Sequence, residues 1–185
     1  MNTIKFMKIV KYLIIIFVIM TIISITSARC DYIKDIDKLK KLKKPILDKE
    51  MMKDYYYDAI YMDEDIDSFL YREYWNHKDN EKIIMGFYIM IYKDNSSALK
   101  TGEQIGGRWK HKDYFGKGFG DKHWIHISKM EPNHKKEYIN IVFVKRNIIV
   151  DLTLCDFTGS QSSINNSYKF IEEIARYAEK FVDEF

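Results

Sequence analysis

Hydrophobic and polar positions divide this chain of 185 residues into an apolar N-terminal run and a longer region of short, alternating segments. Residues 12–28 carry no charge, and residues 13–25 are mostly aliphatic. Three lysines precede the run, and Thr26 and Ala28 are small residues at the positions that a signal peptidase requires. Seventeen uncharged residues are also at the short end of what can cross a bilayer. The pattern predicts residues 1–28 as a signal peptide or an uncleaved membrane anchor.

A lysine-rich connector follows over residues 29–45. Apolar residues from Ile33 to Leu42 recur at every third position, which suits a short amphipathic helix that ends before Pro45. Such a helix could lie on an anionic membrane surface, but the interspersed acids favour a solvated stalk. The lysines on both flanks of the apolar run leave an inverted anchor open, whereas the shape of a signal peptide favours export.

The region after the connector, residues 46–185, has the length of one domain with its own core. We expect one or two helical turns, an extended stretch at Tyr55–Tyr57 and then a solvated acidic loop at residues 63–67. Residues 68–76 and 83–92 are rich in aromatic and β-branched side chains, and a polar turn separates them. This arrangement predicts two antiparallel strands.

A short helix and three further strands are predicted in the second half of the chain. Ser96 or Ser97 can cap a helix that runs to about Trp109, although three glycines weaken it. After a glycine-rich loop, residues 122–129 have the character of a strand. A hairpin follows at residues 138–154, with a turn between its two arms.

The hairpin has the clearest alternation in the chain. Apolar residues at every second position share one face over residues 138–144 and again over residues 148–154. Asp151 and Thr153 point to the opposite face. A period of two with one apolar face is what a half-buried sheet requires.

The last segment has the strongest helical pattern. Its apolar residues follow the i, i+3, i+4, i+7 spacing, and its charged residues face away from them. We expect this stripe to cover one face of the sheet. The apolar residues are Ile171, Ile174, Ala175, Ala178, Phe181, Val182 and Phe185.

Together the elements predict an α+β fold, in which an antiparallel sheet of about five strands packs against a long C-terminal helix and a shorter middle helix. The order of elements over residues 66–185 resembles that of PsbP-like exported domains. The resemblance is one of topology, because no motif specific to that family is present, so it carries over no functional residue. It implies a non-catalytic accessory or binding role.

Charge excludes one class of partner. The first 28 residues contain three of the 30 Lys and Arg residues and no acid, so the rest of the chain has 27 basic and 27 acidic side chains. A domain that is formally neutral lacks the basic surface on which nucleic-acid binding depends. The membrane, through residues 1–28, and a small anionic ligand or a protein are the expected partners.

Motifs for catalysis, metals and nucleotides fail in detail. Gly116, Gly118 and Gly120 precede a strand rather than a helix, which is the reverse of the dinucleotide-binding context. His123 and His126 fall on a predicted strand, where they point to opposite faces and cannot share a metal. We therefore expect no cofactor. Whether the two cysteines, Cys30 and Cys155, form a disulfide is left open by the pattern.

One segment stands out as a candidate binding surface. Six of the eight glycines lie between Gly102 and Gly120, and the sequence there interleaves basic and aromatic residues. Glycine-rich turns can hold an anion on backbone N–H groups, and rings can stack on a base or a sugar. The alternative is a loop whose rings pack at the edge of the core. The candidate ligand-binding residues are Arg108, Trp109, Lys110, His111, Tyr114, Lys117, Trp124 and His126.

The sequence thus favours an exported, membrane-associated domain with a non-catalytic binding or accessory role. An extracytoplasmic hydrolase without a recognisable motif and a structural component of the cell envelope are the alternatives. Neither catalytic residues nor a metal site can be named from the sequence.

Overall fold

A computed structural model describes residues 3–42, 44–107, 118–127, 137–156 and 164–184. The fold is α+β, as the sequence predicts. Its helices are α1 (Thr3–Lys40), α2 (Asn95–Gly106) and α3 (Ile164–Asp183). Its strands are β1 (Tyr55–Glu64), β2 (Ser68–His77), β3 (Asn80–Tyr92), β4 (Lys122–Ile127), β5 (Glu137–Lys145) and β6 (Ile148–Asp156).

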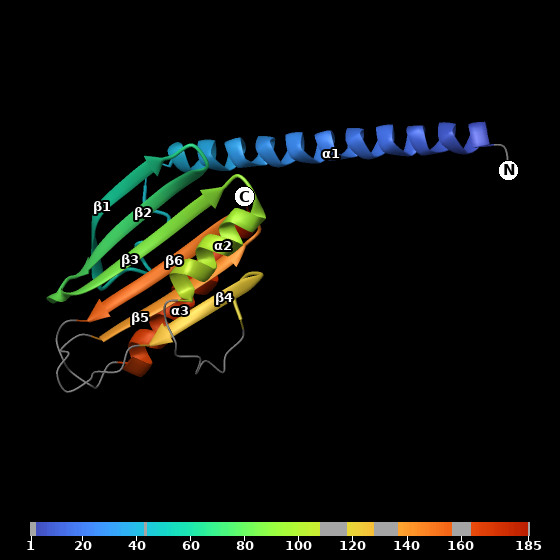
Figure 1. The fold of residues 1–185 in the computed structure, drawn as a ribbon. Helices are drawn as coiled ribbons and strands as arrows, with labels where there is room; N and C mark the ends of the chain where they lie inside the picture. The colour runs from blue at the N-terminus through green and yellow to red at the C-terminus, as the bar shows by residue number, and fades with distance from the viewer. Residues whose placement is uncertain (1–2, 43, 108–117, 128–136, 157–163, 185) are drawn as a thin grey trace.

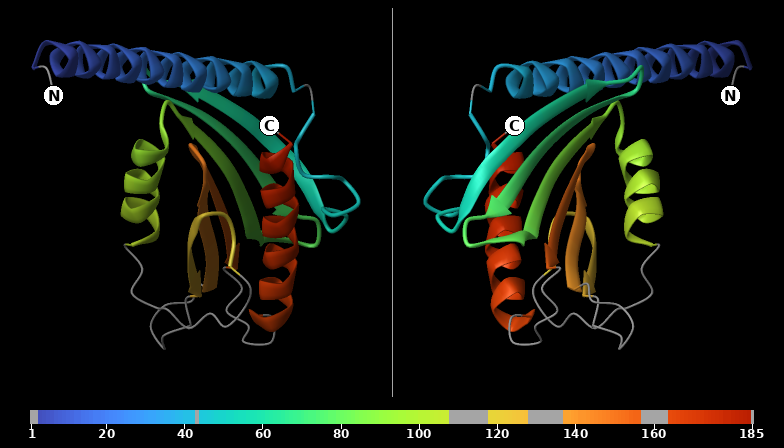
Figure 2. Two further views of the ribbon diagram at one scale, coloured as in Figure 1. Left: turned by 90° about the vertical axis from the view of Figure 1, so that its right-hand side faces the viewer. Right: turned by 90° about the vertical axis from the view of Figure 1, so that its left-hand side faces the viewer.

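The six strands form one antiparallel sheet in the order β1-β2-β3-β6-β5-β4, so β1 and β4 are its edges. The helices α2 and α3 lie on opposite faces of the sheet (Figure 2). Helix α1 crosses one end of the strands and extends far beyond them, with the N-terminus distant from the sheet (Figure 1). The predicted hairpins 68–92 and 138–154 are confirmed, with tighter turns than expected.

The main core lies on the α3 face of the sheet. Alternate residues of β2, β3, β5 and β6 point into it, as the period of two predicts. The apolar stripe of α3 covers them, because Ile171, Ile174, Ala175, Ala178 and Val182 are all fully buried. Of the other predicted residues of the stripe, Phe181 is partly buried, and Phe185 lies outside the described residues.

The C-terminal turns of α1 belong to the same core. Tyr32, Ile36 and Leu39 are buried among the residues of the α3 face, whereas Ile33 is half exposed. Their i, i+4, i+7 spacing places them on one side of a helix. The interpretation of residues 29–44 as a solvated stalk is therefore wrong, since three apolar side chains pack tightly against the domain.

The acidic segment after the connector also differs from expectation. The extended stretch expected at Tyr55–Tyr57 continues to Glu64 as an edge strand, so the sheet has six strands rather than about five. Asp63 and Glu64 end this strand instead of lying in a loop. Most side chains of β1 are exposed on both of its faces, which removes the alternation that would have revealed a strand.

Helix α2 begins with a different cap from the one expected. Asp94, not Ser96 or Ser97, is the N-cap, and its carboxylate accepts a hydrogen bond of 2.8 Å from the backbone N–H of Ser97. The hydroxyls of both serines also donate to it, and these bonds hold the pKa of Asp94 below its usual value. The serines thus support the cap from the first turn.

The N-terminal part of α1 presents apolar side chains to its surroundings. Val10 and every residue from Tyr12 to Met20 are large hydrophobic residues that are at least 38% exposed. Within the described residues, no helix combines the length and the apolarity needed to cross a membrane. The expectation that residues 1–28 act as a signal peptide or an anchor stays a prediction.

Candidate functional site on the open half of the sheet

The two faces of the sheet are covered unequally. On the α3 face, α3 and the C-terminal turns of α1 pack over the core. On the other face, α2 covers β4, β5 and β6 through a small apolar cluster around Ala98 and Val144. Figure 1 looks onto this face, where no described helix lies in front of β1, β2 and most of β3, although α2 also packs against Met90 and Tyr92 at the end of β3. We call this uncovered region, together with Asp151 at its border on β6, the open half.

A row of polar and aromatic side chains crosses the open half at right angles to the strands. Tyr61 of β1 is paired with Arg72 of β2, Arg72 with Tyr88 of β3, and Tyr88 with Asp151 of β6. Directly paired residues point to the same face, so all four side chains emerge together. We refer to these four residues and Tyr74 as the tyrosine surface.

The three tyrosines form a chain of edge-to-face ring contacts. The ring centres of Tyr61 and Tyr74 are 5.7 Å apart, and those of Tyr74 and Tyr88 are 5.8 Å apart. The hydroxyl of Tyr88 donates to that of Tyr74 over 3.3 Å, and burial together with this bond raises the pKa of Tyr88. Tyr61 remains 55% exposed. The rings of this surface thus differ in their exposure to solvent, from the partly buried Tyr88 to the exposed Tyr61.

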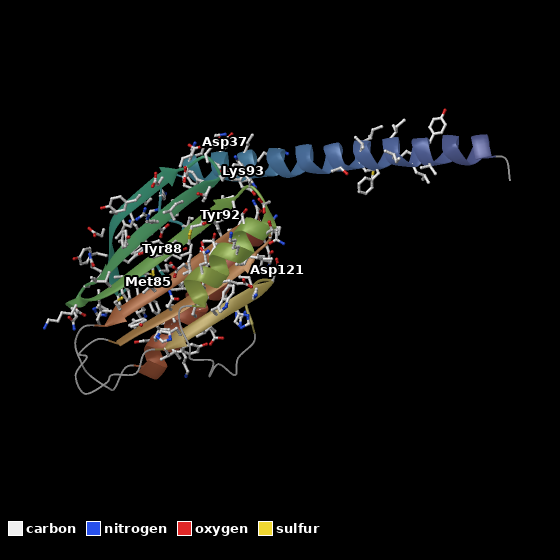
Figure 3. All side chains as sticks on the ribbon, in the orientation of Figure 1. Asp37, Met85, Tyr88, Tyr92, Lys93 and Asp121 are labelled. Atoms are coloured by element: carbon white, nitrogen blue, oxygen red, sulfur yellow. The ribbon has the colours of Figure 1, made fainter. Side chains whose placement is uncertain are left out.

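Glycine at position 86 gives Tyr88 its place. A Cβ atom at Gly86 would lie 2.7 Å from Cε2 and 2.9 Å from the hydroxyl oxygen of Tyr88, so the Tyr88 ring lies over the glycine. Figure 3 labels Tyr88 midway along β3, away from the end of the strand at Tyr92 where α2 begins. A larger residue at position 86 would push this ring off the sheet.

Arg72 lies between Tyr61 and Tyr88 with hydrogen-bonding capacity unused. Its Nε is buried and has no hydrogen-bond partner among the described residues. The side chain as a whole is half-buried. A buried N–H group without a protein partner is costly, so such a group is normally satisfied by an ordered water, an ion or a ligand.

Asp151 stands on the far side of Tyr88 from Arg72. Its Oδ1 accepts hydrogen bonds from the side chains of Asn140 at 2.6 Å and Thr153 at 3.4 Å. Among the described residues no hydrogen bond reaches Oδ2. Burial raises the pKa of Asp151, and the two hydrogen bonds oppose this shift. The carboxyl group is therefore held in a fixed orientation with one oxygen available.

The arrangement brings a cation, a carboxyl group and aromatic rings to one part of the sheet. Arg72 and Asp151 flank a tyrosine ring, each with an unused donor or acceptor, and each is fixed by its place on a strand. Rigid strands position such groups well. No group of three or more His, Cys, Asp or Glu side chains that could hold a metal occurs in the described part of the chain.

Most of the site predicted from sequence lies outside the part of the chain that the structure describes. Arg108, Trp109, Lys110, His111, Tyr114 and Lys117 lie outside the described residues. Only Trp124 and His126 of the eight candidates fall within them. The prediction of a ligand site at residues 108–126 stays a prediction.

The ring of Trp124 packs against α2. A Cβ atom at Gly106 would lie 2.4 Å from Trp124, and one at Gly102 would lie 3.1 Å from it. The glycines thus bring the helix close to β4, and Lys122 places its Nζ 5.4 Å from the Trp124 ring. Phe119 of the same segment is fully buried. Both rings behave as the alternative interpretation predicts, by packing at the edge of the core.

The two histidines of β4 point to opposite faces, as predicted for a strand. His123 contacts the ring of Phe119 with a centroid distance of 6.1 Å, and burial lowers its pKa. His126 is buried on the α2 face with its ring 5.1 Å from that of Tyr138. It shares a transverse row with Asn140 and therefore borders the Asp151 end of the tyrosine surface.

A second buried carboxylate, Glu73, lies on the α3 face and is fully satisfied. Its Oε1 accepts from the backbone N–H of Ile46 and from the Tyr71 hydroxyl at 2.5 Å. Its Oε2 accepts from the Trp75 indole N–H at 3.0 Å and from the N–H of Leu47 at 3.5 Å. Burial raises the pKa of Glu73 against these four bonds. The group holds the segment after α1 onto β2, which is a structural role.

The tyrosine surface escaped the sequence analysis because its members are far apart in the chain. Asp151 and Thr153 were correctly expected to point away from the core of the hairpin. The signal that could have extended this expectation is the alternation of Arg72 and Tyr74 with buried residues in β2. The partner in β3, Tyr88, lies across the predicted 68–92 hairpin, but the place of Asp151 follows only from the pairing of β3 with β6, which joins residues 63 positions apart at this point.

Comparisons with known proteins place the chain in no family. No family model matches it. No curated protein matches it either. It is similar to the crystal structure of the extracellular domain of PknH from Mycobacterium tuberculosis, with 10% sequence identity and a TM-score of 0.47. That similarity covers 74% of this chain and 90% of that chain. The PsbP-like resemblance gains no support from these comparisons.

Proposed function

We propose that this protein is an exported, membrane-associated domain that binds a ligand and does not itself catalyse a reaction. The observation that carries the membrane attachment is the exposed apolar part of α1. The observation that supports binding is the tyrosine surface, where Arg72 and Asp151 keep unused hydrogen-bonding groups beside aromatic rings.

The apolar part of α1 needs an apolar environment. Its residues Tyr12–Met20 are exposed one after another, so they lie on every side of the helix over more than two turns. A helix that is apolar all round is stable inside a protein core or in lipid. No described element covers this part of α1, and the three preceding lysines suit a segment that enters a membrane.

Helix α1 joins its apolar N-terminal part to the domain without a break. The helix is continuous to Lys40, and its residues Tyr32, Ile36 and Leu39 are part of the core. In the proposed function, the segment that meets the membrane would therefore be joined to the domain by a rigid helix and not by a flexible stalk. Cleavage after Ala28 would cut within α1 and would leave these three residues packed in place.

The first experiment measures the intact mass of the native protein and the access of a protease to the domain on whole cells. We expect the protease to reach the domain from outside. A full-length chain would identify residues 1–28 as an anchor, whereas a chain that starts at residue 29 would identify them as a signal peptide and would contradict attachment of the mature protein through this segment. A domain protected from the protease would contradict export.

A pair of substitutions tests the membrane attachment itself. Phe17→Lys places a charge in the apolar run, where Phe17 is 74% exposed, and a charge at the centre of a membrane helix costs about 3 kcal/mol. We expect it to move the protein from the membrane fraction to the soluble fraction. Ile33→Lys, at a half-exposed position of α1 beyond the run, is the matched control and should leave the protein in the membrane. An equal distribution of both variants would refute the attachment.

A further inference from the structure

We propose that the tyrosine surface binds an acidic sugar, with the acid group on Arg72, the sugar ring over Tyr88 and a hydroxyl on Asp151. The inference rests on the proposed binding function and names the chemical class of its ligand. It goes beyond that function because membrane attachment and binding could both hold for a different ligand.

Arg72 selects an acid group. Its guanidinium is a fixed cation with N–H groups arranged as a fork, which matches the two oxygens of a carboxylate or a phosphate. Its Nε has no partner in the described structure, and the hydrogen bonds that Asp151 accepts there come from Asn140 and Thr153 and not from Arg72. The cation is thus left for an external anion.

Asp151 selects a hydroxyl group. The oxygen Oδ2 accepts no hydrogen bond from the described residues, whereas Asn140 fixes Oδ1 from the other side at 2.6 Å. An ionised carboxylate only accepts hydrogen bonds, so its natural ligand partner is an O–H or N–H donor. A ligand that is anionic at one end and rich in hydroxyls at the other satisfies both residues.

The distance between the two groups fits one ring. Arg72 and Asp151 lie on strands separated by β3 alone, so their backbones are about 10 Å apart, which is two strand spacings. An arginine side chain is long enough to narrow this gap to the span of a single ring. The ring of Tyr88 lies beside the gap, over Gly86, which belongs to the neighbouring row of paired residues. The C–H groups of a sugar pack well on such an aromatic platform, and Tyr61 and Tyr74 border it.

The same chemistry argues against other ligands. A polyanion such as nucleic acid would meet a carboxylate beside the only cation of the row, and its affinity depends on many cations. An uncharged apolar ligand would exclude water from Arg72 and Asp151 without supplying hydrogen bonds to them, and this desolvation costs free energy. A neutral sugar would satisfy Asp151 but would leave the Arg72 charge unpaired.

The test compares ligands that differ at one group. The full-length protein in neutral detergent micelles is titrated with methyl glucuronide, methyl glucoside and glucose 6-phosphate, and binding is followed by NMR. We expect methyl glucuronide to bind at least about tenfold more tightly than methyl glucoside, because a single charge-assisted pair is worth that factor. The phosphate arm shows whether the acid group must be a carboxylate or whether any acid group suffices. Either result there agrees with an acidic sugar.

Variants locate the site. Arg72→Met should abolish the preference for the acidic sugar, and Arg72→Lys should retain part of it because the charge remains without the fork. Lys100→Met removes one exposed positive charge from α2 on the same face and should change nothing. Circular dichroism confirms that each variant is folded before titration.

Three outcomes would overturn the inference. They are equal affinity for the acidic and the neutral sugar, a preference that survives Arg72→Met, and no binding of any of the three sugars. None of these outcomes touches the membrane attachment, which the fractionation of Phe17→Lys measures separately. The ligand class and the proposed function can therefore fail independently.

Discussion

On the α3 face, Glu73 is fully buried and its two carboxylate oxygens accept hydrogen bonds from four donors. On the open half, Asp151 is half-buried and accepts hydrogen bonds at one oxygen only, and the neighbouring Arg72 has a buried N–H without a partner. Both faces belong to the same sheet, yet Glu73 has donors for both of its oxygens, whereas Arg72 and Asp151 each keep an unused group.

This difference distinguishes a structural polar group from one available for binding. Desolvating a carboxylate costs several kcal/mol unless donors surround it, so a fully satisfied group such as Glu73 stabilises the fold and has nothing to offer a ligand. Groups that keep an unused donor or acceptor make the folded state less stable than it could be. Such groups are expected at functional sites, where a ligand supplies the missing hydrogen bond.

The largest expected effect on stability comes from removing the Glu73 carboxylate on the α3 face. Glu73→Ala leaves four donors without an acceptor, two of them backbone N–H groups of the segment that follows α1. Buried donors that lose their partner cost about 1–3 kcal/mol each, with partial relief by relaxation, so the free energy of unfolding should fall by about 3 kcal/mol or more. Urea denaturation followed by circular dichroism measures the loss.

The control is Glu64→Ala at the end of β1. Glu64 pairs with Lys40 at the surface and is more than half exposed on its side chain. Exposed ion pairs contribute about 1 kcal/mol at most, so this variant should remain close to the wild type. Similar losses for the two variants would mean that Glu73 is no more important to the fold than a surface acid.

Elements with one strongly apolar face were predictable from sequence, and elements without such a face were not. The β5–β6 hairpin and α3 each bury one face against the other, so their periods of 2 and 3.6 are visible in the residues themselves. The strand β1 is mostly exposed on both faces, so its tyrosines predicted only the extended stretch at its start and not its continuation to Glu64. Its structure depends on pairing with β2.

The C-terminal turns of α1 were misjudged for a more specific reason. The sequence suggested a stripe beginning at Ile33, but the buried stripe begins at Tyr32 and includes Asp35. A buried acid between apolar residues hides the periodicity. Whether such a stripe faces a protein core, a membrane or water depends on a sheet formed by residues far away in the chain.

A smaller effect on stability is expected from a substitution at Gly86, in the open half. A Cβ atom in Gly86→Ala would overlap the Tyr88 ring, which must move because the clash involves a side chain and not the backbone. We expect a stability change of about 1 kcal/mol, since the half-buried ring can move toward solvent. The hydroxyl contact between Tyr88 and Tyr74 should be lost, and with it the NMR signature of the two rings.

The matched variant Tyr88→Phe removes the same hydroxyl contact but keeps the ring in place over the glycine. The two variants together separate the role of the ring position from that of the hydroxyl. If Gly86→Ala leaves the ring signals of Tyr88 and Tyr74 unchanged, the glycine does not determine the shape of the tyrosine surface.

The smallest effect concerns the pH dependence of stability. Burial raises the pKa of Asp151 above its ordinary value of 3.8, because the loss of solvation outweighs the hydrogen bonds from Asn140 and Thr153. In the unfolded chain the group titrates at its ordinary pKa, so over the interval up to the raised pKa the folded state binds more protons. The free energy of unfolding must therefore fall as the pH rises through this interval.

Asp151→Asn removes the titration while keeping an oxygen acceptor for Asn140. The wild type should be most stable relative to this variant below about pH 4, and the difference should decline as the pH rises. Glu73 titrates in both proteins and cancels in the comparison. Urea denaturation midpoints of the two proteins, measured from pH 3.5 to 7, test this. A difference that stays constant with pH would mean that solvent reaches Asp151 freely. The open half would then be an ordinary polar surface. It would not be a site that keeps a partly desolvated carboxyl group available to a ligand.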